Sequence, residues 1–317
     1  MSHLAGQPIY TVTLNPGLDR TLTVPEIRYN EVLRASEVHL DWGGKGFNVS
    51  RALMALGVPS VAMGFVGGRV GDMLKEGLHE LGIATDFVTI AGESRTNTVF
   101  AEAGSDRYLK VNEAGPAVDG CALDALYGRV EELAEAGGLW TLCGSLPPGV
   151  PTDTYAHLVA SIHRAGGLAF LDASGPALVE GCRAKPFLVK PNAEEAAEVV
   201  GAKVESREDA LRAAQHFLDA GVSVVALSMG ADGLVLASQT GTVAAKPPAV
   251  EAHTLVGVGD AMLAGLIYGV RSDLELPDIA RWGVAAGTAA AMGQGVSVGR
   301  LESVTKLAAR VDVCVLS

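Results

Sequence analysis

A single carboxylate stands between two glycines and an apolar run in TLVGVGDAMLAG, residues 254–265. From Asp260 the apolar spacing is helical, so unpaired N–H groups and the positive end of the helix dipole converge on Gly257, Val258 and Gly259. These amides would form an anion hole. An aspartate at a helix start is usually an N-cap. Beside an anion hole it could instead accept the proton of a hydroxyl that attacks phosphorus. The segment therefore predicts a cap or a general base.

Two glycine-containing motifs could bind the ligand that such a base would serve. GGKGFN (43–48) opens a helix, where glycines let the backbone approach a ligand, and Lys45 adds a cation. GSLPPG (144–149) follows an apolar run and presents the hydroxyl of Ser145 in a loop stiffened by two prolines. Each motif also has a purely structural interpretation, as a tight helix start and as a rigid turn.

A third motif, KPN (190–192), follows another apolar run. It places Lys190 and Asn192 at a strand end, with Glu195 on the first turn of the following helix. Asn192 and Glu195 have the spacing of a capping box, so a helix start explains them as well as a ligand does.

Short apolar runs alternate with helical patterns along the chain, which predicts an α/β fold with a mostly parallel sheet covered by helices on both faces. Ligands then bind at the carboxyl ends of the strands. The expected strands cover residues 9–14, 60–67, 139–144, 168–173, 187–190 and 223–228. The expected helices cover residues 48–57, 71–82, 152–167, 192–201 and 207–221, with another from 260 onward.

Two segments break this rhythm. Residues 20–42 and 94–116 show alternation and a GSD turn, which predict hairpins or extended strands in a small β-sheet that projects from the main domain. We assign its lid segments to about 20–42 and 94–112. The sequence has no Pro/Ser-rich linker, low-complexity tract or internal repeat, so we expect a single domain over residues 1–317.

Composition and charge exclude several classes of protein. The formal net charge of −12 argues against binding to nucleic acid or to an anionic membrane surface. The four cysteines show no CxxC spacing, so neither a zinc site nor a disulfide framework is expected. The N-terminus lacks the pattern of a signal peptide, and no apolar run reaches the ~18 residues of a membrane span. We therefore expect a cytoplasmic protein.

Nine ordered motifs together resemble the ribokinase-like phosphofructokinase B family of carbohydrate kinases. They are TVTLNPGLDR, GGKGFN, SRTNT, VNEAGP, GSLPPGVP, LDASG, FLVKPN, LSMGADG and GVGDAMLAG. The segment RWGVAAGTAAAMGQG (281–295) extends the similarity towards the C-terminus. Within the family, TLNPGLD, GGKG, RTN and AKPP are most similar to 1-phosphofructokinases, with tagatose-6-phosphate kinases and type-2 6-phosphofructokinases as close relatives.

The resemblance implies a ribokinase-like three-layer α/β/α fold and transfer of a phosphoryl group from ATP, with Mg²⁺, to a ketose phosphate. Fructose 1-phosphate, giving fructose 1,6-bisphosphate, is the expected acceptor, and a kinase of another sugar or sugar phosphate is the alternative. A non-catalytic sugar-phosphate sensor is a third possibility, but a sensor would not need Asp260. The resemblance also implies that the lid serves as the contact of a homodimer.

The family pattern assigns roles to individual residues. Asp260 would be the catalytic base, and the anion hole would consist of Gly257, Val258 and Gly259. The sugar would contact Gly43, Gly44, Asn48, Ser145 and Asp19, the last expected at the end of the first strand. The phosphate already on the sugar would contact Lys45 and Arg95. The ATP site would be lined by Lys190, Asn192, Ser228, Gly230 and Gly233, with Glu195 helping to hold a hydrated Mg²⁺.

The catalytic loop departs from the family at one position. The family usually has a small residue between the two glycines, whereas this chain has Val258. A β-branched residue tolerates positive φ poorly, so a stiffer or differently tilted loop is expected. Trp42, directly before the sugar loop, is expected in the lid core or as a wall over the sugar.

Overall fold

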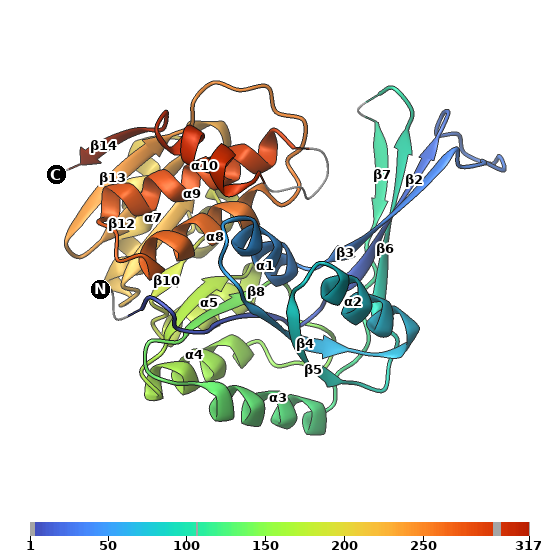
Figure 1. Cartoon of the computed structure of the whole chain (residues 1–317), viewed down its shortest axis with the longest axis horizontal. Coiled ribbons are helices and arrows are strands. Elements are labelled where there is room, and N and C mark those ends of the chain that lie inside the picture. Colours follow the sequence, from blue (N-terminus) through green and yellow to red (C-terminus); the bar gives the residue numbers. More distant parts are fainter. Residues whose placement is uncertain (1–3, 106, 294–298, 317) are drawn as a thin grey trace.

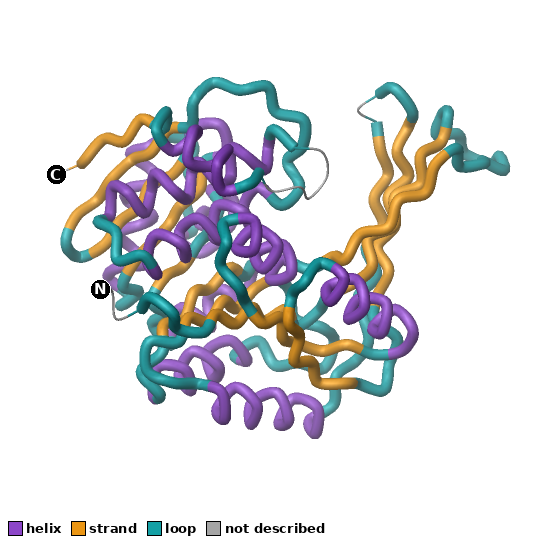
Figure 2. Tube along the Cα trace, viewed as in Figure 1, coloured by secondary structure: helices purple, strands orange, loops and turns teal. Residues whose placement is uncertain are grey.

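The computed structural model describes residues 4–105, 107–293 and 299–316. It shows a large sheet flanked by helices and a small sheet that projects from it (Figures 1 and 2). Asp106 of the expected GSD turn, the last two residues of the motif at 281–295 and the chain ends of the expected single domain lie outside the described residues. Among the helices of the described part, none is both long and apolar enough to cross a membrane.

The large sheet is mostly parallel, as predicted. Its strand order is β14-β13-β12-β11-β10-β9-β8-β1-β4-β5, with parallel pairing from β11 to β5 and antiparallel pairing from β11 to β14. Six strands match predicted runs: β1 (Ile9–Thr13), β4 (Val61–Val66), β8 (Leu139–Cys143), β9 (Leu168–Asp172), β10 (Leu188–Val189) and β11 (Val224–Ser228). Four were not predicted: β5 (Ala84–Thr89), β12 (Leu234–Ser238), β13 (Gly241–Lys246) and β14 (Asp312–Leu316).

Helices cover both faces of this sheet because successive strand residues point to opposite sides. In β8, Leu139 joins one buried cluster and Trp140 the other. The Leu139 side is covered by α1 (Lys45–Ala55), α8 (Val258–Arg271), α9 (Leu276–Ala291) and α10 (Leu301–Ala308). The Trp140 side is covered by α3 (Gly120–Leu133), α4 (Thr154–Arg164), α5 (Gly175–Arg183), α6 (Ala193–Val200) and α7 (Arg207–Asp219). The three-layer α/β/α prediction is confirmed.

The projecting sheet has four strands in the order β3-β2-β6-β7. They are β2 (Gly17–Val24), β3 (Glu37–Gly43), β6 (Arg95–Glu102) and β7 (Tyr108–Val111). The two predicted segments therefore supply all four strands, although β2 begins earlier than expected. Asp19 consequently lies inside β2 of the lid, and its expected place at the end of the first strand is wrong. The central pair, β2 and β6, is parallel and sets Gly17 opposite Arg95.

The two faces of the lid differ in character. The pairing register gathers apolar side chains on one face, which we call the apolar lid face: Leu22, Val38, Leu40, Phe100, Leu109 and Val111. Several of them are solvent-exposed, Val38 to 55% and Val111 to 51%. The opposite face carries Asp19, Asn97, Val99 and Lys110. The lid is thus a sheet with an apolar side that its own chain leaves largely uncovered.

Trp42 fixes the base of the lid to the main domain. Its ring packs with the cluster that contains Phe47 and Leu74, and it lies on Gly77 of α2 (Gly68–Glu80). A Cβ at Gly77 would stand 2.0 Å from the ring, so only glycine leaves room there. Trp42 therefore belongs to the core at the lid base.

Candidate active site

Asp260 lies in the first turn of α8, which begins at Val258 after the N-cap Gly257. Gly257 adopts the positive φ of the turn (74°), so Val258 is an ordinary helical residue and does not carry the strain that its branching predicted. The N–H of Ala261 donates to the Gly257 carbonyl (2.9 Å), and the N–H groups before it precede the first hydrogen bond of the helix. They form the predicted donor cluster at the positive end of the helix dipole.

The Asp260 carboxylate accepts its hydrogen bond from a side chain of α1 and not from an amide at the start of its own helix. Its Oδ2 accepts a hydrogen bond from Asn48 Nδ2 (2.7 Å), and the residue is only 6% exposed. Burial raises the pKa of Asp260 to about 6, against the opposing effect of Lys45. The group is therefore ionised at neutral pH and binds a proton more tightly than an ordinary aspartate, as a general base should. Asn48, which was expected to contact the sugar, thus forms a hydrogen bond with the candidate base.

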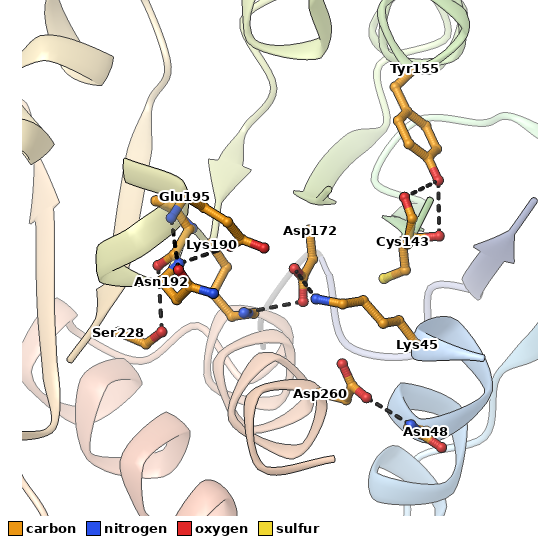
Figure 3. Close-up of polar contacts among 12 residues, drawn as sticks. Lys45, Asn48, Cys143, Tyr155, Asp172, Lys190, Asn192, Glu195, Ser228 and Asp260 are labelled. Atoms are coloured by element: carbon orange, nitrogen blue, oxygen red, sulfur yellow. Dashed lines mark hydrogen bonds and ion pairs between the residues drawn. The ribbon is translucent and has the colours of Figure 1, made fainter. Parts of the chain in front are cut away.

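Asp172, at the end of β9, connects the predicted residues but was not itself predicted. It is fully buried and forms ion pairs with Lys45 Nζ (2.8 Å) and Lys190 Nζ (3.1 Å). Figure 3 shows the carboxylate between the two ammonium groups. Burial would raise the pKa of Asp172, but the two lysines outweigh it and lower the pKa. The sequence motif LDASG that contains Asp172 was recognised, but its ion pairs with Lys45 and Lys190 were not predicted because these residues are distant in sequence.

The two lysines supply the cations that the segment around Asp260 lacks. A Cβ built on Gly259 would lie 3.4 Å from Lys190 Nζ, so this ammonium group stands at the first turn of α8. Burial would lower the pKa of Lys45, but the carboxylates Asp172 and Asp260 outweigh it and raise the pKa. Lys45 is therefore charged, and both lysine side chains lie near the N-terminus of α8, where an anion would be stabilised.

A pocket of about 220 Å³ lies beside this cluster. Lys45, Arg95, Ser145 and Gly44 line it, so four of the predicted sugar and phosphate residues come together there. Its other lining residues are Thr13, Asn15, Gly144, Ala173 and Ser174. Two cations and several hydroxyls make the pocket suitable for an anionic polyol.

Arg95, one of the residues that line this pocket, is held in place by its neighbours. A Cβ at Gly17 would stand 2.7 Å from Arg95 Cγ, so the side chain runs directly over that glycine. Its Nη1 donates to the Glu113 carbonyl (3.2 Å). Burial lowers the pKa of Arg95, while Asp19 and Glu113 oppose the effect. The side chain is therefore constrained by packing as well as by hydrogen bonding.

Asp19 and Gly43 form a separate contact at the base of the lid. Asp19 Oδ1 accepts a hydrogen bond from Asn97 Nδ2 (2.8 Å). A Cβ at Gly43 would stand 2.5 Å from Asp19 Oδ2, so the glycine makes room for the carboxylate. Neither residue lines the pocket described above.

The residues predicted to bind ATP cluster at the neighbouring ends of β10 and β11. Asn192 and Ser228 form a bridge between the two segments, and the Ser228 N–H donates to the Pro191 carbonyl (3.0 Å). Gly230 opens a 3₁₀ turn that ends at Gly233, whose φ is 91°. A Cβ at Gly233 would stand 2.0 Å from the Ala245 carbonyl oxygen, so this position requires glycine.

Asn192 and Glu195 do form a capping box at the start of α6, as their spacing predicted. The Asn192 N–H donates to Glu195 Oε2 (2.9 Å), and the Glu195 N–H donates to Asn192 Oδ1 (2.8 Å). Within the described ranges, no group of three or more His, Cys, Asp or Glu side chains could hold a metal ion.

Several known proteins are similar to this chain over most of its length. The 1-phosphofructokinase of Rhodobacter capsulatus is 36% identical over 274 residues, which cover 86% of this chain and 87% of that protein. The 1-phosphofructokinase of Bacillus subtilis is 34% identical over 305 residues, covering 96% of this chain and 99% of that protein.

Solved structures share the whole architecture. Phosphofructokinase-2 from Escherichia coli superposes with a TM-score of 0.91 at 29% identity and covers 96% of this chain and 99% of its own. A possible 1-phosphofructokinase from Thermotoga maritima gives a TM-score of 0.87 at 28% identity, covering 98% and 100%. The model of the pfkB family of carbohydrate kinases matches residues 14–302. The chain therefore belongs to the pfkB family of carbohydrate kinases.

Proposed function

We propose that this protein transfers the γ-phosphoryl group of ATP to the C6 hydroxyl of fructose 1-phosphate, giving fructose 1,6-bisphosphate and ADP. The observation that carries the proposal is Asp260, a buried carboxylate with a raised pKa at a helix N-terminus. The names of the two relatives, 1-phosphofructokinase, support the choice of acceptor.

The proposed reaction uses these groups as follows. The oxygen of the acceptor hydroxyl attacks the γ-phosphorus, its proton passes to Asp260, and the bond from phosphorus to the β–γ bridging oxygen breaks so that ADP leaves. The amides of Gly257, Val258 and Gly259 stabilise the charge on the phosphoryl oxygens. Asn48 orients the base by donating to one carboxylate oxygen, which leaves the other free for the hydroxyl.

The phosphate already on the sugar is the second element of the proposal. Arg95 and Ser145 bind it in the pocket, and Lys45 contributes charge from the inner wall. Asp19, with the backbone of Gly43 and Gly44, binds sugar hydroxyls when the lid closes over the site. Asp19 suits this role because an ionised carboxylate only accepts hydrogen bonds, and hydroxyls donate them.

ATP occupies the neighbouring strand ends in this proposal, along the residues Lys190, Asn192, Ser228, Gly230 and Gly233. We expect Glu195 to accept a hydrogen bond from a water molecule of a hydrated Mg²⁺, because its Oε2 is fixed by the capping box while the residue is only half-buried. When bound, the ion would neutralise charge on the ATP phosphates.

The apolar lid face supports a homodimer. An exposed apolar sheet face of this kind is usually covered. A second copy of the chain can cover it symmetrically. The polar face, with Asp19 and Asn97, then remains available to the substrate.

A coupled assay for ADP release tests the function. The panel comprises fructose 1-phosphate, tagatose 6-phosphate, fructose 6-phosphate and free fructose, with Asp260→Asn as the blank for contaminating kinases. We expect kcat/KM for fructose 1-phosphate to exceed kcat/KM for each of the other three sugars by at least about tenfold. One well-aligned, charge-assisted hydrogen bond to the sugar phosphate can provide a difference of this size. A higher value for another member of the panel would replace the acceptor in this proposal. If none of the four sugars leads to ADP release, the proposed kinase activity is refuted.

A further inference from the structure

One buried carboxylate holds two ammonium groups at this site. Asp172 is fully buried, and its two oxygens divide between the lysines, Oδ1 to Lys45 at 2.8 Å and Oδ2 to Lys190 at 3.1 Å. The lysines come from different parts of the chain, the start of α1 and the end of β10. Figure 3 shows them approaching Asp172 from opposite sides, with Asp260 on the Lys45 side.

The two lysines border different regions. Lys45 lines the pocket that contains Arg95 and Ser145, and Asp260 acts on its charge. Lys190 stands at Gly259, on the first turn of α8, next to the strand ends proposed for ATP. The sugar pocket and the region proposed for ATP therefore each have one of the two cations.

We propose that Asp172 is a positioning residue that keeps Lys45 and Lys190 on the two sides of the transferred phosphoryl group. The proposal rests on the function proposed above. Asp172 makes no contact with the phosphoryl group in it and acts only through the two lysines.

Charge and exposure explain why such a tether is needed. Two ammonium groups repel each other, and a carboxylate between them adds two attractions that offset this repulsion. The Lys190 side chain is only 4% exposed and has little freedom, whereas the Lys45 side chain is 40% exposed and can turn towards solvent. Loss of the Asp172 charge should therefore release Lys45 first.

The first test is Asp172→Asn, which keeps the shape of the side chain and removes its charge. We expect kcat to fall by about 10²-fold, the usual cost of losing one preorganised electrostatic contact. The KM for fructose 1-phosphate should rise by a smaller factor than kcat falls, because Arg95 and Ser145 stay in place and only the charge that Lys45 adds to the pocket is lost. The matched control is Asp86→Asn, which breaks the ion pair with Arg129 (2.7 Å) in a distant part of the fold. It should leave both constants unchanged.

The pH profile separates positioning from a merely structural role. The polar and charged groups that act on Asp260 are Lys45, Asp172, Asn48 and Lys190. Release of Lys45 removes the charge that lowers the pKa of Asp260 most, and this outweighs the loss of the Asp172 charge, so the acid limb of kcat/KM should move to higher pH. A shift to lower pH would show that Lys45 stays in place without Asp172 and would overturn the proposal. A structural defect would lower the amount of active enzyme without moving the limb.

A double-mutant cycle tests whether Asp172 acts through Lys45. Lys45→Met should reduce kcat less in the Asp172→Asn background than in the wild-type protein, because the lysine has already lost its position. If the two losses multiply independently, or if Asp172→Asn keeps the wild-type kcat, the proposal is wrong.

If Asp172→Asn does not fold, the lysines provide the second test. With Lys45 gone, Asp172 pairs wholly with Lys190 and draws it from α8, so the loss in Lys45→Met/Lys190→Met should be smaller than the product of the single losses. If the loss of kcat in the double variant equals the product of the two single losses, the proposal is overturned. Failure of the proposed function itself is distinguishable, since the wild-type protein would then not phosphorylate fructose 1-phosphate at all.

Discussion

Replacing Asp260 with asparagine should reduce turnover and increase stability at the same time. The amide has the shape of the carboxylate and can still accept the hydrogen bond from Asn48, but it cannot accept the proton of the substrate hydroxyl. General-base catalysis contributes roughly 10²–10⁴-fold. We therefore expect kcat to fall by at least about 100-fold, with little change in the affinity for ATP.

The effect on stability follows from the same pKa. The carboxyl has an ordinary pKa of 3.8 and a pKa of about 6 in the folded protein, where burial disfavours its charge. Each unit is worth about 1.4 kcal/mol, so the ionised group costs the folded state about 3 kcal/mol at neutral pH. Because the folded state binds the proton more tightly, this cost is absent below about pH 4 and grows as the pH rises through about 6.

The assay combines ADP release with calorimetry at two pH values. At about pH 8 the Asp260→Asn variant should melt above the wild-type protein by about 4 °C, and the gap should close towards about pH 4. A variant that keeps more than about a tenth of the wild-type rate would refute the base assignment. A variant that melts lower at pH 8 would show that Asp260 stabilises the fold, contrary to the argument from burial.

Three further substitutions test the pocket, the lid and its base. Arg95→Ala should raise KM for fructose 1-phosphate by more than about tenfold and leave KM for ATP unchanged, since a charge-assisted contact contributes about 1.5–3 kcal/mol. An equal rise in KM for both substrates would instead assign Arg95 to the ATP side of the site. Leu109→Lys on the apolar lid face should yield monomers in sedimentation equilibrium, whereas Val99→Lys on the opposite face should not; identical behaviour would exclude this dimer face. Gly77→Ala should lower Tm by steric conflict with the tryptophan ring, whereas Gly128→Ala, with no atom within 4 Å, should raise it.

The fold was predictable wherever buried strands appear as apolar runs. Six strands of the large sheet were found in this way, but its two edges, β5 and β14, were missed. β5 is half exposed and its sequence ATDFVT contains polar residues, whereas β14 (DVCVL) contains a short apolar run that was overlooked. Strand β12 has a buried apolar sequence, LVLAS, and its signal was present in the chain. The lid was predicted as two segments, whereas the parallel pairing of β2 with β6 depends on three-dimensional register.

The candidate site was predictable residue by residue, but its connections were not. Lys45 and Lys190 were recognised from the motifs around them, yet neither motif shows that both contact Asp172. The hydrogen bond from Asn48 to Asp260 joins positions 212 residues apart. Contacts of this kind arise from the packing of α1, α8 and β9, which a single sequence does not display.

The parallel pairing within the lid has a consequence for folding. Gly17 lies opposite Arg95, and the chain between β2 and β6 includes β4 and β5 of the large sheet. Closing such a long loop costs entropy that β2 and β6 recover only when the intervening structure has formed. The lid should therefore assemble last and open first, at a lower free energy than the main sheet in native-state hydrogen exchange. Because Asp19 and Arg95 belong to these two strands, mild denaturation would abolish sugar binding while the large sheet is still intact.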